Sequence, residues 1–115
     1  MNRNILEQMN DLFDPYDLFS GTGKNKIHSS ITTRFPNISN KEIKEAEDYL
    51  HSFYVYCLKY ADILADKYKT PFLPKGEDAQ KKISEYVSEC QKQYPEIGAE
   101  KIEGIFSIAC WLANR

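Results

Sequence analysis

Residues 39–71 read SNKEIKEAEDYLHSFYVYCLKYADILADKYKTP, and this stretch decides the fold. Ser39 followed three residues later by Glu42 forms a capping box, which marks the N-terminus of a helix. Pro71 lacks a backbone N–H and marks the end of that helix. The pattern of apolar residues between these signals predicts one long helix at about residues 40–69, with one face in the core. That face consists of Ile43, Ala46, Leu50, Phe53, Tyr54, Cys57, Ala61, Leu64, Ala65 and Tyr68.

A second strip of side chains lies beside this face on the same predicted helix. It widens the apolar arc beyond that of a surface helix, so we expect the helix to be central in the fold. A tyrosine ring fits the edge of a core, with its hydroxyl in water, as well as it fits a protein interface. The tyrosines of the strip are therefore candidate partner contacts, and the sequence leaves core and interface both open. The strip consists of Tyr49, Tyr56, Tyr60 and Ile63.

Outside the long helix, residues 20–25 are polar and glycine-rich and predict a flexible loop, and residues 70–76 predict a linker. No stretch alternates apolar and polar residues between hairpin turns, as strands would. The sequence therefore predicts an all-α fold, a single-domain bundle of about five helices over residues 1–115. The other four helices are predicted from apolar residues at helical spacing in residues 5–13, 27–35, 79–94 and 102–113.

The composition is that of one folded domain. Hydrophobic residues make up 42% and charged residues 28% of the 115 residues, as in globular proteins. The net charge of −2 and the pI near 5.7 predict no general attraction to nucleic-acid phosphates or anionic lipids. No apolar run reaches the roughly 18 residues that span a bilayer, so we expect no membrane contact and a cytoplasmic protein. The three cysteines lie far apart within apolar patterns, which indicates reduced core residues.

No motif in the sequence predicts catalysis, a metal or a cofactor. Residues 20–24, SGTGK, approach a phosphate-binding loop, but the full pattern needs other residues where Leu18 and Asn25 stand. The histidines and cysteines lack zinc-type spacing. His51 and Cys57 fall on different faces of the predicted helix and cannot form a nucleophilic pair. We therefore expect a protein that is not an enzyme and that needs neither metal nor cofactor.

A DNA-binding helix-turn-helix is suggested by the outline of residues 27–48. A short helix, a break at residues 36–38 and the capped helix from Ser39 have the expected order. The first turns of the second helix carry Lys41 and Lys44, but also four carboxylates, which would repel phosphates. A small helical regulator that binds DNA or associates with itself is therefore the alternative function. The oligomeric state is open.

The most distinctive stretch is DLFDPYDLF, residues 11–19, in which Asp-Leu-Phe occurs twice around Asp-Pro-Tyr. It combines carboxylates with aromatic rings, and aromatic anchors ringed by charge are typical hot spots of protein interfaces. The alternative is a turn that closes one end of the bundle with its Leu and Phe side chains, while its Asp residues cap helices. On the first interpretation, the partner-binding residues are Asp11, Phe13, Asp14, Tyr16 and Asp17.

Charge is unevenly distributed along the first third of the chain. Residues 1–20 hold one base and four acids, net −3, whereas residues 21–38 hold three bases and no acid, net +3. Oppositely charged neighbouring segments suit a protein partner better than a nucleic acid.

Small size, mild acidity, an all-α pattern and many tyrosines together resemble the general character of bacterial immunity proteins, which bind a cognate toxin domain and block its active site. The resemblance implies a non-catalytic protein-binding module whose acidic-aromatic stretch or tyrosines contact the toxin. An acidic patch could occupy a basic nuclease cleft by mimicking phosphate.

Overall fold

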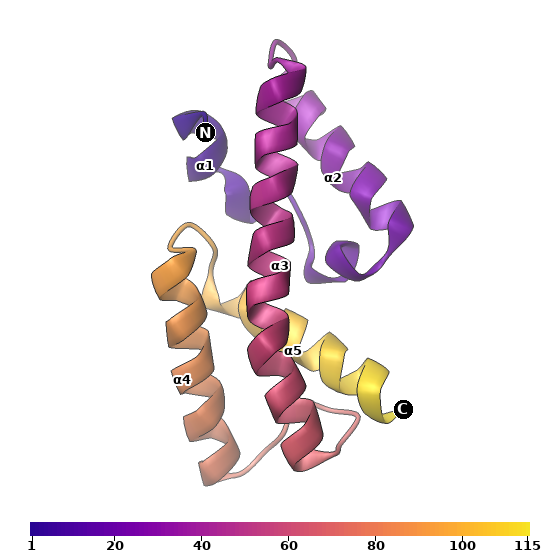
Figure 1. Cartoon of the computed structure of the whole chain (residues 1–115), viewed down its shortest axis with the longest axis vertical. Coiled ribbons are helices and arrows are strands. Elements are labelled where there is room, and N and C mark those ends of the chain that lie inside the picture. The colour runs from indigo at the N-terminus through magenta and orange to yellow at the C-terminus, as the bar shows by residue number, and fades with distance from the viewer.

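The computed structural model describes all 115 residues, and its regular secondary structure is entirely helical (Figure 1). The predicted all-α class is therefore confirmed, with five α-helices and two short 3₁₀ helices. In chain order these are α1 (Arg3–Glu7), η1 (Met9–Asp11), η2 (Pro15–Phe19), α2 (Gly21–Arg34), α3 (Asn40–Tyr68), α4 (Glu77–Gln93) and α5 (Ala99–Asn114).

The long helix α3 confirms the prediction from residues 39–71. Ser39 is its N-cap, and the Ser39 hydroxyl accepts a hydrogen bond from the backbone N–H of Glu42 at 3.2 Å. The helix ends at Lys69, which adopts a left-handed conformation with φ of 46°, shortly before Pro71. The capping and stop signals in the sequence therefore placed both ends of this helix correctly.

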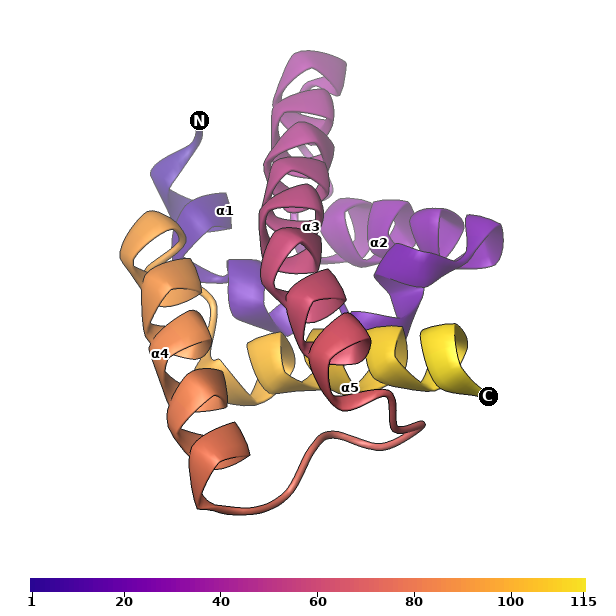
Figure 2. The same ribbon diagram turned by 60° about the horizontal axis from the view of Figure 1, so that its bottom comes forward.

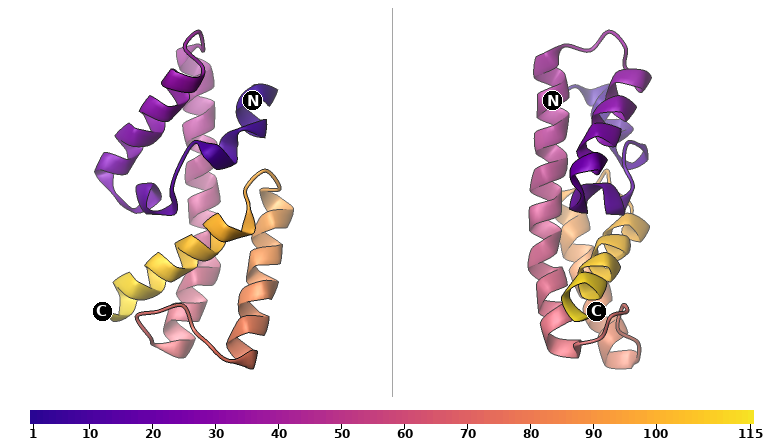
Figure 3. Two further views of the ribbon diagram at one scale, coloured as in Figure 1. Left: turned by 180° about the vertical axis from the view of Figure 1, so that it is seen from behind. Right: turned by 90° about the vertical axis from the view of Figure 1, so that its right-hand side faces the viewer.

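The other helices pack against one side of α3. α2 and α4 flank it, and α5 crosses it (Figure 1, Figure 2). A view from the side shows that the outer face of α3 stays uncovered (Figure 3). The molecule is therefore flat, with Cα extents of 47 × 27 × 17 Å. α3 is central in its contacts, because it touches α2, α4, α5 and η2, but it is not surrounded on all sides.

The core is one continuous cluster of 23 buried residues. In the predicted face of α3, eight residues are buried, and only Tyr54 and Tyr68 are half-buried. The most extensive packing is between α3 and α5, which buries Phe106 completely. The three cysteines are free and buried, as expected. No helix combines the length and the apolar character that a membrane span requires.

The predicted helix over residues 5–13 is wrong in its extent. α1 ends at Glu7, and the chain continues through η1 into η2, with Pro15 at the first position of η2. The apolar residues of the segment are buried as predicted, but a distant contact determines its path. The side-chain oxygen of Asn10 accepts a hydrogen bond from the backbone N–H of Gly98 at 2.7 Å, at the N-terminus of α5. Local periodicity cannot reveal a contact between residues 88 positions apart.

The predicted loop at residues 20–25 is also wrong, because these residues cap and begin α2. The hydroxyl of Ser20 accepts a hydrogen bond from the backbone N–H of Gly23 at 3.0 Å. This N-cap offsets the low helix propensity of the glycines. Gly23 is buried against η2, where a Cβ would overlap the backbone of Asp17 and lie 2.5 Å from its carbonyl carbon. Glycine therefore lets α2 pack directly on η2.

Candidate functional site

Residues 11–17 cross one edge of the molecule, and α5 holds them in place. Phe13 is buried, and its ring packs edge-to-face on Phe53 of α3 with 5.9 Å between centroids. The ammonium group of Lys101, on α5, lies 4.7 Å from the centre of the Phe13 ring. The same group donates hydrogen bonds to the carbonyl oxygens of Asn10 and Phe13. The segment is thus fixed by a buried ring and by a charged donor from the far end of the chain.

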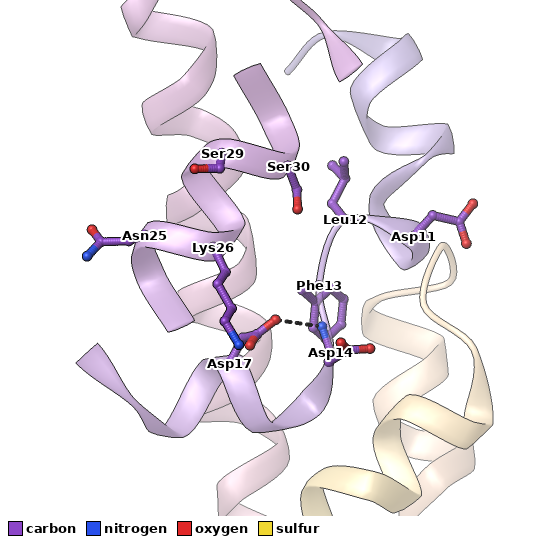
Figure 4. Close-up of a pocket in the computed structure, with 9 residues that line it drawn as sticks. All are labelled: Asp11, Leu12, Phe13, Asp14, Asp17, Asn25, Lys26, Ser29 and Ser30. Carbon is purple, nitrogen blue, oxygen red and sulfur yellow. Dashed lines mark hydrogen bonds between the residues drawn. The ribbon is translucent and has the colours of Figure 1, made fainter. Parts of the chain in front are cut away.

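Between this segment and α2 lies an open pocket of about 480 Å³, here called the acidic pocket (Figure 4). Its wall on the segment consists of Asp11, Leu12, Phe13, Asp14 and Asp17. Its wall on α2 consists of Asn25, Lys26, Ser29 and Ser30. The structure therefore brings four of the five predicted residues of the acidic stretch to one pocket. The fifth, Tyr16, does not line the pocket and is 63% exposed on η2.

The three carboxylates of the acidic pocket differ in their surroundings. Asp11 lies 3.9 Å from the guanidinium of Arg34, so the oppositely charged segments noted in the sequence partly neutralise each other. Asp14 is exposed and forms no ion pair. Asp17 is buried, and its Oδ2 accepts a hydrogen bond from the backbone N–H of Asp14 at 3.0 Å. Lys26 is the only base in the wall, so the pocket carries an excess of negative charge.

The tyrosines of the second strip contact α4 and its C-cap, because Tyr60 packs on Tyr86, and Tyr49 and Tyr56 pack on Tyr94. The Tyr49 hydroxyl donates a hydrogen bond to the Glu96 carboxylate at 2.8 Å, and its ring meets Tyr94 at 5.3 Å between centroids. Partial burial and this hydrogen bond raise the pKa of Tyr49 above its usual value. Tyr56 and Tyr60 pack on each other and against the core. All three are half-buried, so each ring has one part in the core and another part in solvent.

A second pocket, of about 320 Å³, lies between η2, α2 and α3. Its apolar wall consists of Leu18, Ile27 and Leu50, and its polar wall of Asp17, Lys24, Glu47, Asp48, His51 and Tyr54. Bases and acids are mixed in that wall, so the charge gives no preference for one sign of ligand. Asp17 lines both pockets and separates them.

Titratable and metal-binding groups show little convergence elsewhere. No group of three or more His, Cys, Asp or Glu side chains is placed to hold a metal ion. Cys57 of α3 interacts with Cys90 of α4 inside the core, and this interaction, together with burial, raises the pKa of the Cys57 thiol. A thiol with a raised pKa is a poor nucleophile at neutral pH. Neither Cys57 nor Cys90 has any exposed surface, so both serve as packing residues in the core.

The α2 wall of the acidic pocket was not among the predicted site residues. Lys26, Ser29 and Ser30 stand three and four positions apart, which places them on one face of a helix. This signal was available in the sequence, but it requires α2 to begin at Gly21 rather than near Ile27. Lys101 was missed for a different reason, because only the folded chain brings it to residues 10–13.

Comparison with known proteins found no match to this chain among family models, curated proteins or solved structures. The candidate site is therefore defined by its own geometry. It combines the acidic pocket, one exposed aromatic ring at Tyr16 and a backbone that α5 fixes.

Proposed function

We propose that this chain is a non-catalytic protein-binding module, and specifically an immunity protein that binds and neutralises a toxin domain in the bacterial cytoplasm. One observation carries the proposal: the acidic pocket lies next to an exposed aromatic ring on the same short segment, residues 11–17. The negative charge of this segment complements a positively charged active site, such as that of a nuclease.

The charges of the segment support recognition of a basic partner. Asp14 is exposed and forms no ion pair. Asp17 adds a second carboxylate close by, which accepts a hydrogen bond from the backbone N–H of Asp14. Negative groups that lack internal counter-ions attract a positively charged cleft and increase the rate of encounter. Lysine and arginine side chains that normally bind substrate phosphates would bind these carboxylates instead, which would block the active site.

Tyr16 and the rigid backbone supply the remaining parts of an interface. The ring of Tyr16 is 63% exposed and can fill an apolar pocket of a partner, as interface hot spots do. Lys101 and Phe13 fix the backbone on which Tyr16 is carried. A preorganised segment loses less conformational entropy on binding than a flexible loop does.

The proposal predicts that a gene adjacent to that of this chain encodes a toxin domain, and the experiment uses that domain. We expect co-expression of the chain to restore growth of cells that produce this domain, and calorimetry to show a complex of the two proteins. Tyr16→Ala and Asp14→Asn should each weaken binding at least about tenfold while leaving the melting temperature unchanged, because both residues are exposed. Asp66→Asn is the matched control, since Asp66 is an exposed acid on α3, outside the candidate site.

Three outcomes would count against the proposal. The first is the absence of a toxin gene beside this one, together with an operon of metabolic enzymes. The second is steep, salt-sensitive binding of duplex DNA, which would favour the regulator alternative. The third concerns the site alone. If Tyr56→Ala weakens toxin binding and Tyr16→Ala does not, the interface lies at the tyrosine strip and not at residues 11–17.

A further inference from the structure

Asp17 is an unusual group because it is the only charged residue among the buried residues of the chain, with 8% of its surface exposed. Its Oδ2 accepts the N–H of Asp14 at 3.0 Å, whereas its Oδ1 accepts no hydrogen bond from the protein. Asp17 takes part in none of the ion pairs of the molecule. Figure 4 shows its carboxylate at the pocket wall, on the side of Lys26.

The Asp17 carboxylate has only one hydrogen-bond partner in the protein and no counter-ion. Buried charges are normally paired with an opposite charge or bound by several donors, because burial removes their hydration. Asp17 accepts one hydrogen bond, from the backbone N–H of Asp14. Its position is fixed because Gly23 packs closely on the backbone of Asp17. The carboxylate is thus held in place by packing and by one backbone donor, and its second oxygen stays accessible from the solvent-filled pocket. Such an anion attracts a cation more strongly than a mobile surface acid, because water screens it less.

We propose that the acidic pocket binds the guanidinium group of an arginine side chain of the protein partner, with Asp17 as the principal anion. The source of the arginine rests on the function proposed above, whereas the chemistry of the site rests on the pocket alone. A guanidinium is planar and can donate two parallel hydrogen bonds to one carboxylate. Its remaining N–H groups can reach acceptors on the opposite wall, where Ser29 and Ser30 stand.

Two neighbouring features fit this ligand. One guanidinium already lies beside the pocket, because Arg34 of the chain itself, outside the pocket wall, lies 3.9 Å from Asp11 and donates to the Gln8 side chain at 3.3 Å. Leu12 and Phe13 provide apolar wall atoms, against which the methylene groups of an arginine can pack. The volume of about 480 Å³ is ample for one such side chain.

Lys26 provides a second test, because removing its charge should change the arginine affinity in the opposite direction to removing the charge of Asp17. It is the only base in the pocket wall, and it is exposed. Its ammonium group forms no ion pair with Asp17, so it does not neutralise the carboxylate directly. It should nevertheless repel an incoming guanidinium. Removing its charge should therefore strengthen arginine binding, whereas removing that of Asp17 should weaken it.

The experiment titrates the ¹⁵N-labelled full chain with the peptide acetyl-Gly-Arg-Gly-amide at millimolar concentrations. The same peptide with citrulline in place of arginine has nearly the same shape without the charge. We expect saturable amide shifts at Asp14, Asp17 and Ser30 with the arginine peptide, and none with the citrulline peptide. Asp17→Asn, which keeps an acceptor for the Asp14 N–H, should lower the affinity at least about tenfold. Lys26→Gln should raise it about two- to threefold, and Asp66→Asn should not change it.

The following results would overturn the inference. They are equal binding of the citrulline peptide, no saturable shift with the arginine peptide, or unchanged affinity in a folded Asp17→Asn variant. If that variant does not fold, unchanged or weaker binding by Lys26→Gln overturns it equally. If free L-arginine binds more than tenfold tighter than the peptide, the pocket is a site for a small molecule. That result would overturn the proposal that the arginine belongs to a protein partner.

The same data separate this inference from the immunity proposal. Specific arginine-peptide binding by a chain that does not bind the toxin domain would refute the immunity proposal and support the chemistry of the pocket. Toxin binding that Asp17→Asn does not affect, without peptide binding, would refute the guanidinium site and leave the immunity proposal standing.

Discussion

Replacing Gly23 with alanine should destabilise the fold, although alanine favours helices more than glycine does. The added Cβ would lie 2.5 Å from the carbonyl carbon of Asp17, where ordinary contact begins at 3.4 Å. The obstructing atoms belong to the backbone of η2, so they cannot rotate away as a side chain would. Because Lys101 binds the segment that leads into η2, the segment resists displacement as well.

The cost can be worked from these contacts. Overpacking a well-packed site costs about 1–3 kcal/mol, and we take the upper end, about 3 kcal/mol, because backbone has to move. The higher helix propensity of alanine returns at most about 1 kcal/mol. The free energy of unfolding should therefore fall by about 2 kcal/mol. In a chain of this length that loss lowers the melting temperature by roughly 8 °C.

Urea and thermal unfolding, followed by circular dichroism, measure this loss. Gly21→Ala is the matched control, because it lies two residues earlier in α2 and a Cβ there meets no atom within 4 Å. We expect Gly21→Ala to be as stable as the natural chain or slightly more stable. A Gly23→Ala chain as stable as Gly21→Ala would refute the close packing of α2 on η2. Equal losses in both variants would assign the effect to the helix terminus instead.

Two further predictions concern other contacts. Lys101→Met keeps the apolar stem but leaves the carbonyl groups of Asn10 and Phe13 without their donor, so the unfolding free energy should fall by about 2 kcal/mol. The control is Lys81→Met, on the exposed side of α4, which should show no loss in urea unfolding. Equal stability of the two variants would contradict the role of Lys101. The raised pKa of Tyr49 means that the folded chain holds this proton more tightly than the unfolded chain, so its contribution to stability is complete below about pH 10 and declines above it. Unfolding between pH 8 and 11.5 should therefore show a shallower alkaline decline for Tyr49→Phe, which lacks the titrating hydroxyl, and an unchanged slope would contradict the raised pKa of Tyr49.

The parts of the fold that sequence predicted well are those fixed by local chemistry. α3 carries its own cap at Ser39, its own stop near Pro71 and one continuous apolar face between them. Each of these signals lies within a few residues of the feature that it determines. The core faces of α4 and α5 followed from the same periodicity.

The N-terminal third was predicted less well because distant residues determine it. α1 stops at Glu7, and the path of the next residues depends on Gly98 and Lys101, about ninety positions later. At Ser20 the error had another origin, since two glycines and several polar residues indicated a loop. One side-chain cap and the packing of Gly23 on η2 make that stretch helical.

The sequence predicted one of the two walls of the candidate site. Its acidic wall stands out in the sequence because Asp, Phe and Tyr alternate within a few residues. Its α2 wall consists of ordinary helical polar residues, which become part of a site only when α2 and η2 meet. For Tyr49, Tyr56 and Tyr60 the pattern was visible in the sequence, but their neighbours on α4 and in the segment after it were not.

The contact of Lys101 with residues 10–13 also dictates when the candidate site can form. During synthesis the acidic stretch leaves the ribosome before Lys101 does, because Lys101 stands about ninety positions later in the chain. Until α5 folds, the carbonyl groups of Asn10 and Phe13 have no donor, and the wall of the acidic pocket has no fixed shape. The wall of the proposed binding site therefore takes its shape only after α5 has been made and folded.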